Sequence, residues 1–127
     1  MSEFVDDVRT FHLATDVPVL ASPQIPNADR ILLRKRLIDE EVNVELFTAM
    51  KENNIVEIAD AIADSIYVLI GTALEYGIPL DAVWGEVQRS NMAKVDPNTG
   101  KVRRREDGKV LKPEGWTKPD IRKALYG

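Results

Sequence analysis

Residues 40–64 read EEVNVELFTAMKENNIVEIADAIAD and combine acidic side chains with apolar sequence. Glu41 and Glu45 are four residues apart, so a helix with 3.6 residues per turn places both carboxylates on one face. A second acidic group follows at spacings of three and four: Glu57, Asp60 and Asp64. Apolar residues around this second group point in nearly every direction about the helix axis, which predicts a buried helix.

Carboxylates in such surroundings are costly unless a cation neutralises them. The chain has no Lys or Arg between Glu52 and Arg89, no cysteine and a single histidine, His12. An all-oxygen ligand set suits a hard cation such as Mg²⁺ or Mn²⁺ better than zinc. The alternative is a solvated acidic stripe without a function. We expect His12 to be a packing or surface residue rather than a catalyst.

Length and composition favour one globular domain. A chain of 127 residues is long enough for one hydrophobic core and short for two. The absence of cysteine excludes a disulfide framework and thiol catalysis. The acidic start of the chain is unlike a secretory signal, and acids interrupt the long apolar run, so we expect a cytoplasmic protein without a membrane span.

The net charge of −4 conceals two halves of opposite sign. Residues 1–93 contain 7 basic and 16 acidic side chains, a balance of −9, whereas residues 94–127 contain 10 basic and 5 acidic, a balance of +5. Such a tail is often a solubilising or disordered end. A carboxylate site that handles polyphosphate would also need cations nearby, so the tail is a candidate phosphate contact.

The pattern along the chain predicts an all-α helical bundle. Asn27 is a favourable N-cap for a helix over 28–51, and the KENN segment at 51–54 predicts a turn before a second helix over 55–76. Gly77 is the expected left-handed stop, and a third helix covers 80–93. Most of the four basic residues near the start of the first helix are predicted to lie on a salt-bridged surface: Arg30, Arg34, Lys35 and Arg36.

We divide the single domain into three segments. Residues 1–26 form an N-terminal arm with a short helix and a proline-rich extended stretch, residues 27–93 form the helical core, and residues 94–127 form the basic tail. A hairpin around Asp107-Gly108 is expected in the tail. Because the second helix has more apolar directions than one short chain can cover, we expect a homodimer or homotetramer to complete the bundle.

The acidic pattern, with Glu40-Glu41 and Glu45 on one helix and Glu57-x-x-Asp60 on the next, resembles the EExxE and ExxD signature of the all-α nucleoside triphosphate pyrophosphatases. That superfamily includes MazG, dimeric dUTPases and phosphoribosyl-ATP pyrophosphohydrolase. Phage-type relatives of the last resemble this chain over residues 28–120, including SNMAKVDP. One departure is visible: the strict motif places its third acid at position 44, where this chain has Val44.

The resemblance implies a Mg²⁺-dependent enzyme, with Mn²⁺ as a substitute, that hydrolyses a nucleotide between its α and β phosphates to a monophosphate and pyrophosphate. It implies metal ligands at Glu41, Glu45, Glu57 and Asp60. Glu41 is the candidate that orients or deprotonates the attacking water. Asn91 and Lys94 are candidates for phosphate contacts. The auxiliary candidates are Glu40, Asp64, Arg103, Arg104, Arg105, Lys109 and Lys112.

Two alternatives stay open. Phosphoribosyl-ATP is the second candidate substrate, because residue spacing does not reveal base or sugar recognition. A non-enzymatic helical oligomer that binds nucleic acid through the tail is a hypothesis from a different class. The tail lacks the regular aromatic residues of a single-strand binder and the body is acidic, so nucleic acid is the weaker expectation.

Overall fold

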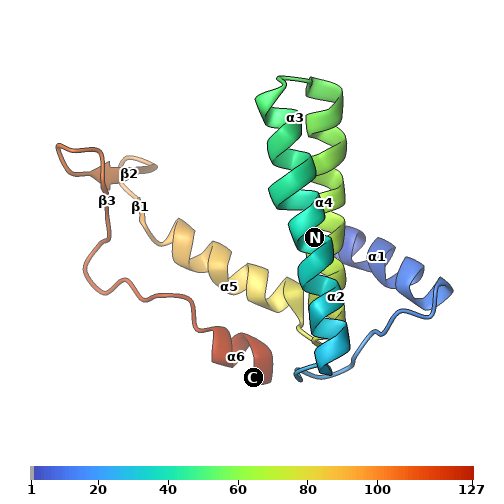
Figure 1. Cartoon of the computed structure of the whole chain (residues 1–127). Coiled ribbons are helices and arrows are strands. Elements are labelled where there is room, and N and C mark those ends of the chain that lie inside the picture. Colours follow the sequence, from blue (N-terminus) through green and yellow to red (C-terminus); the bar gives the residue numbers. More distant parts are fainter. Residues whose placement is uncertain (1) are drawn as a thin grey trace. The chain divides into compact units, whose positions relative to one another are not determined.

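The computed structural model describes residues 2–127, which fold mainly as helices with a small sheet near the C-terminus (Figure 1). The chain separates into two compact units, residues 1–80 and residues 81–127. Among the described residues, no helix is both long and apolar enough to cross a membrane.

The first unit contains a long helical hairpin. Its first arm comprises α2 (Ala28–Ile38), the π-helix η1 (Asp39–Leu46) and α3 (Phe47–Lys51), and its second arm is α4 (Ile55–Glu75). The two arms pack side by side and run antiparallel (Figure 1). As predicted, Asn27 caps α2 by accepting a hydrogen bond from the Arg30 amide, and Asn53 has a positive φ of 53° in the turn.

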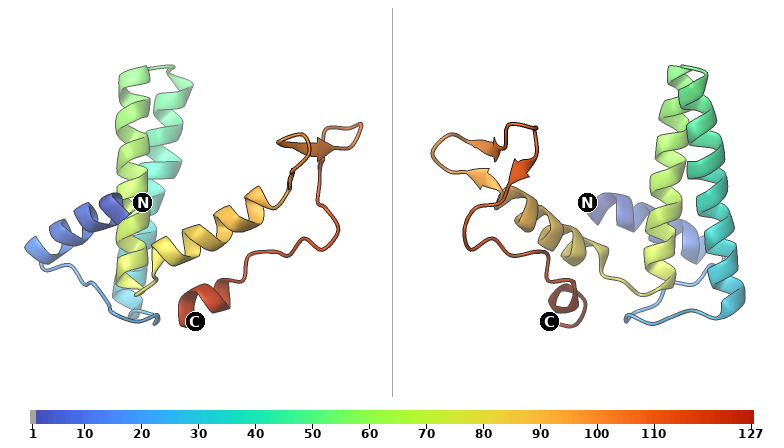
Figure 2. Two further views of the ribbon diagram at one scale, coloured as in Figure 1. Left: turned by 180° about the vertical axis from the view of Figure 1, so that it is seen from behind. Right: turned by 60° about the vertical axis from the view of Figure 1, so that its left-hand side comes forward.

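The buried core of this unit lies between α4 and α1 (Ser2–Ala14), which crosses α4 in all the views (Figures 1 and 2). Val5 and Val8 of α1 meet Ile70 and Leu74 of α4. The segment after α1 then follows α4, with the Leu20 amide donating to the Leu74 carbonyl. The observed core therefore includes residues that the sequence assigned to an N-terminal arm.

Within this chain, α4 is not buried all round. Its apolar side chains pack against α1 and the first arm, but others remain exposed. Large apolar side chains of α4 with at least two fifths of their surface exposed are Ile55, Val56, Ile62, Ile66 and Leu69. The burial predicted for this helix is therefore only partial within one chain. An apolar face of α4 remains exposed and is available for other contacts.

The second unit contains α5 (Leu80–Met92), the strands β1 (Val95–Asp96), β2 (Lys101–Arg104) and β3 (Val110–Leu111), and α6 (Ile121–Tyr126). The strands form an antiparallel sheet in the order β1-β2-β3. The predicted hairpin is confirmed as β2 and β3, with Gly108 at a φ of 89° in the turn. The strand β1 was not predicted from the sequence.

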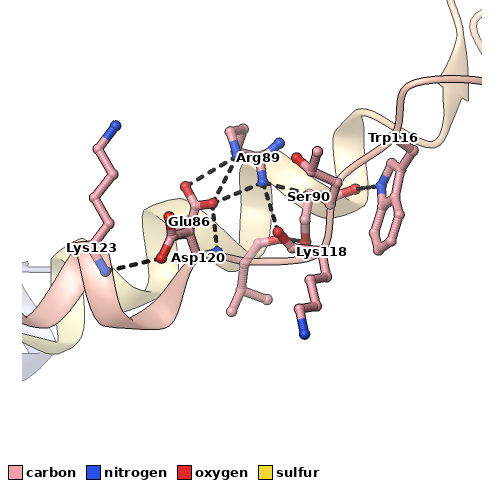
Figure 3. Close-up of polar contacts among 9 residues, drawn as sticks. Glu86, Arg89, Ser90, Trp116, Lys118, Asp120 and Lys123 are labelled. Atoms are coloured by element: carbon pink, nitrogen blue, oxygen red, sulfur yellow. Dashed lines mark hydrogen bonds and ion pairs between the residues drawn. The ribbon is translucent and has the colours of Figure 1, made fainter.

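Polar contacts attach the last segment to α5 (Figure 3). Glu86 accepts hydrogen bonds from Arg89 and from the Asp120 amide, and Arg89 also donates to the Lys118 carbonyl. These contacts hold the pKa of Glu86 at about 2, with the Arg89 hydrogen bonds as the largest cause. Nearby, Trp116 Nε1 donates to the Ser90 carbonyl at 2.7 Å. The tail is therefore folded against α5 rather than extended.

Candidate active site

Three carboxylates from the two arms of the helical hairpin meet at one point. Glu41 and Glu45 come from η1, Asp64 comes from α4, and one oxygen of each lies within 4.8 Å of the others. The backbone adds a link between the arms, because Ser65 Oγ contacts the Glu41 carbonyl at 3.4 Å. Packing of η1 on α4 thus assembles an acidic cluster that neither helix contains alone.

The helix type explains the unusual spacing of the first two acids. Residues 39–46 form a π-helix, where the sequence predicted an unbroken α-helix. The hydrogen bonds of a π-helix join residues i and i+5 rather than i and i+4, so this helix type can accommodate one extra residue relative to an α-helix. Glu45 lies with Glu41 in the cluster, as the spacing predicted, while Val44, at the position of the motif's third acid, is 53% exposed.

Like charges meet in this cluster, in which Glu41 and Asp64 are half-buried and Glu45 is exposed. The pKa of Glu41 is raised to about 7, first by burial, then by the adjoining carboxyl of Glu45 and the charges of Asp64 and Glu40. The pKa of Asp64 is also raised, by burial and by the charges of Asp60 and Glu45. Among residues 2–127, no basic side chain forms a salt bridge with Glu41, Glu45 or Asp64. A cation would relieve this repulsion.

One oxygen of Glu41 shows how well the cluster fits a metal ion. Oε2 of Glu41 is shielded from solvent and has no hydrogen-bond partner anywhere in the described chain. Leaving a buried carboxylate oxygen unpaired is costly, and coordination to a cation removes that cost. The donors are all carboxylate oxygens, as Mg²⁺ and Mn²⁺ prefer. The residues present therefore fit a hard divalent cation.

The other predicted acids lie around this cluster rather than in it. Glu57 and Asp60 are exposed on the N-terminal half of α4, and Glu40 is exposed on η1. Asp60 acts on the cluster through its charge, which raises the pKa of Asp64. The structure thus adds Asp64 to the first ligand candidates. The ligand roles of Glu57 and Asp60 stay predictions.

A buried ion-pair network joins α2 to the C-terminal end of α4. It was not predicted from the sequence. Glu75, with a fully buried side chain, accepts hydrogen bonds from Arg30 Nε at 2.7 Å and Arg34 Nη1 at 3.0 Å. Arg34 also donates to Thr72 Oγ1 and to the Val68 carbonyl. Arg34 is therefore an exception to the surface role predicted for most of these basic residues, because its buried side chain reaches from α2 to α4.

His12 completes this network from α1. Its ring is buried beside Arg34, and its Nδ1 lies 3.2 Å from the Pro18 carbonyl. Burial lowers the pKa of His12, which favours the neutral ring beside the arginines. A β-carbon on Gly71 would lie only 2.6 Å from Arg34 Nη2 and 2.8 Å from His12 Nε2, so glycine makes room for both side chains. Of the two roles expected for His12, packing or surface, its burial fits packing.

The predicted phosphate contacts lie in the second unit. Asn91 is at the end of α5, and its side-chain oxygen accepts a hydrogen bond from Lys94 Nζ at 3.0 Å. Of the auxiliary candidates, Arg104 donates to the Gly108 carbonyl and Arg105 pairs with Asp107, so both stabilise the hairpin turn. Their roles toward substrate, with that of Lys109, stay predictions.

The sequence profile of the phosphoribosyl-ATP pyrophosphohydrolase family matches residues 8–91 of this chain. These residues comprise the helical hairpin with its acidic cluster and most of α1 and α5. The fold and site define an all-α protein of the MazG-like nucleoside triphosphate pyrophosphatase superfamily. Within that superfamily, the chain belongs to the phosphoribosyl-ATP pyrophosphohydrolase family.

A curated viral protein is also similar. The uncharacterized protein L479 of Acanthamoeba polyphaga mimivirus is 47% identical over 55 residues, which cover 43% of this chain and 22% of the relative. The match therefore spans about a fifth of the length of that protein. Its printed name assigns no activity.

Proposed function

We propose that this chain is a Mg²⁺-dependent nucleotide pyrophosphohydrolase that cleaves a nucleoside triphosphate between its α and β phosphates, releasing a monophosphate and pyrophosphate. The family assignment supports nucleotide pyrophosphohydrolase activity in general. The observation that carries the proposal is the buried, unpartnered oxygen of Glu41 in a cluster with Glu45 and Asp64. Such a cluster is unfavourable without a cation, and nucleotide phosphates bind to proteins together with Mg²⁺.

The side chains of this site divide into two roles. Glu45 and Asp64 hold the cation, together with one oxygen of Glu41, and Mn²⁺ substitutes for Mg²⁺. The bound cation supplies positive charge that offsets the charge of the phosphate oxygens. Glu41 orients the attacking water and accepts its proton.

The reaction balances as a hydrolysis. The water oxygen forms a bond to one phosphorus of the α–β anhydride, the bond from that phosphorus to the bridging oxygen breaks, and the bridging oxygen leaves with the other product. In this scheme Lys94 and Asn91 contact the phosphate chain, with Lys94 acting as a point charge. Catalysis then consists of positioning and charge stabilisation, as in other phosphoryl transfers.

Phosphoribosyl-ATP is the second candidate substrate, because the matched family is described by that activity. A panel of nucleoside triphosphates and phosphoribosyl-ATP, assayed for pyrophosphate release with and without Mg²⁺, separates the two. We expect Mg²⁺-dependent release from at least one nucleotide and loss of that release in Glu41→Gln. No release from any substrate, combined with a mobility shift of DNA, would replace the enzyme proposal with the nucleic-acid hypothesis.

A further inference from the structure

The second unit contains a basic pocket formed entirely by its own residues. Lys94, Arg103 and Lys112 line this pocket of about 220 Å³, which we call the basic pocket. Asp96 is the acidic side chain in its lining.

The charges in the basic pocket do not cancel. Three cations face one carboxylate, and Asp96 accepts a hydrogen bond from the Asn98 amide at 2.8 Å within its own turn. None of the salt bridges found among residues 2–127 involves Lys94, Arg103 or Lys112. A pocket with an excess of about two positive charges attracts a polyanion of matching size.

The fold holds two of these cations in place. The ring of Trp116 lies near both ammonium groups, 5.5 Å from Lys94 Nζ and 4.4 Å from Lys112 Nζ, within cation–π distance. The ring is itself fixed, because Nε1 donates to the carbonyl of Ser90, a buried residue of α5 (Figure 3). Asn91 restrains Lys94 from the other side. Ordering long side chains before a ligand arrives lowers the entropic cost of binding.

The sheet supplies the third cation. Arg103 of β2 is paired in register with Leu111 of β3, and both residues line the basic pocket. Lys112 directly follows β3, while Lys94 directly precedes β1. The small sheet therefore brings together cations that are 18 residues apart in the sequence. The sheet therefore positions the lining residues of the basic pocket.

We propose that the basic pocket is a metal-independent binding site for a phosphate chain, with Lys94, Arg103 and Lys112 as its contacts and Trp116 as the platform that orders the two lysines. The phosphate chain has two sources, inorganic pyrophosphate or the triphosphate of a nucleotide. A role for the pocket in catalysis rests on the proposed function, but binding itself does not.

Trp116 provides the readout. Trp84→Phe leaves Trp116 as the remaining tryptophan of the chain. In this background and with EDTA present, titration with sodium pyrophosphate should change the emission of Trp116 saturably, because the ligand's negative charge neutralises the two ammonium groups that lie over the ring. Lys112→Ala and Arg103→Ala should each raise the dissociation constant for pyrophosphate about tenfold, as expected for loss of one charge-assisted contact.

The matched control is Lys118→Ala. Lys118 is exposed in the same unit, does not line the basic pocket and carries the same charge. Its removal should change affinity less than about twofold, as expected when a distant surface charge is screened by salt. Helical circular dichroism checks that each variant is folded, and Lys112→Arg should recover most of the affinity lost in Lys112→Ala.

Parallel titrations identify the ligand source. Tighter binding of pyrophosphate than of a non-hydrolysable nucleoside triphosphate assigns the pocket to the product, and the reverse assigns it to the substrate. Absence of saturation by millimolar pyrophosphate, equal weakening by Lys118→Ala and Lys112→Ala, or saturation by single-stranded DNA alone would overturn the proposal. Glu41→Gln should leave pyrophosphate binding in EDTA unchanged, so failure here is distinct from failure of the proposed enzyme.

Discussion

Glu75→Gln should strongly destabilise the first unit, because it removes the only acidic partner seen for two arginines of α2 in the described chain. The side chain of Glu75 is 0% exposed and that of Arg34 is 7% exposed, so the arginine charge would stay buried without compensation. Breaking a buried ion pair on one side costs about 3–5 kcal/mol. Arg30, at 29% exposure, keeps part of its hydration and adds less.

Urea unfolding followed by helical circular dichroism measures this loss in the full chain. Glu52→Gln is the matched control, since Glu52 is exposed and should change the free energy of unfolding by less than about 0.5 kcal/mol. The double substitution Arg34→Met/Glu75→Leu should recover most of the stability, because it removes both buried charges. A loss below about 1 kcal/mol in Glu75→Gln, or no recovery in the double variant, would refute the assigned role of the network.

Three further predictions follow from the site and the exposed surface. Because the folded pKa of Glu41 is about 7, above its ordinary 4.5, its contribution to the stability of the metal-free protein should be present below about pH 4.5 and lost as pH rises through 7. Thermal melts across this range should show a falling melting temperature. Glu41→Gln or added Mg²⁺ should reduce this dependence on pH. Lys94→Ala should lower turnover about tenfold or more with little change in melting temperature, measured by initial rates of pyrophosphate release; equal turnover in both proteins would remove Lys94 from the mechanism. The exposed apolar face of α4 should make the chain a homodimer or homotetramer, so light scattering should give a multiple of 14.3 kDa, and Ile62→Glu with Ile66→Glu should shift it toward one chain; a folded wild-type monomer at micromolar concentration contradicts this.

Local signals in the sequence were sufficient for much of the fold. The cap at Asn27, the turn at Asn53 and the positive φ of Gly77 were all predicted, because each depends on the chemistry of a few neighbouring residues. The hairpin around Asp107-Gly108 was predicted for the same reason. Helical periodicity likewise gave α4 and α5 within about one residue of their observed ends.

Contacts between distant segments could not be obtained in this way. An acid such as Glu75 in an apolar run signals a buried charge, but periodicity does not show that its partners are Arg30 and Arg34 of another helix. The core role of α1 was missed because only Val5 and Val8 of its apolar residues are buried, while Phe4 and Phe11 are exposed.

The candidate site was predicted in part. The pairing of Glu41 and Glu45 on one face followed from spacing, although the helix there is a π-helix, a form that propensity does not indicate. From the sequence, Asp64 was ranked only as an auxiliary ligand, below Glu57, because the two residues are nearly two helical turns apart. The choice among acids on one stripe depends on where the neighbouring helix crosses, and η1 crosses α4 at the level of Asp64.

The most direct test of the central claim is calorimetric titration of the apo protein with Mg²⁺ and Mn²⁺ at pH 7. The account predicts binding that Glu41→Gln and Asp64→Asn each weaken at least about tenfold, as expected when one ligand of a metal site is lost. It also predicts that cation binding releases protons at pH 7, since burial and neighbouring carboxylates raise the pKa of Glu41 and keep part of it protonated in the metal-free chain. Undiminished binding in both variants, without proton release, would contradict a metal site at Glu41, Glu45 and Asp64.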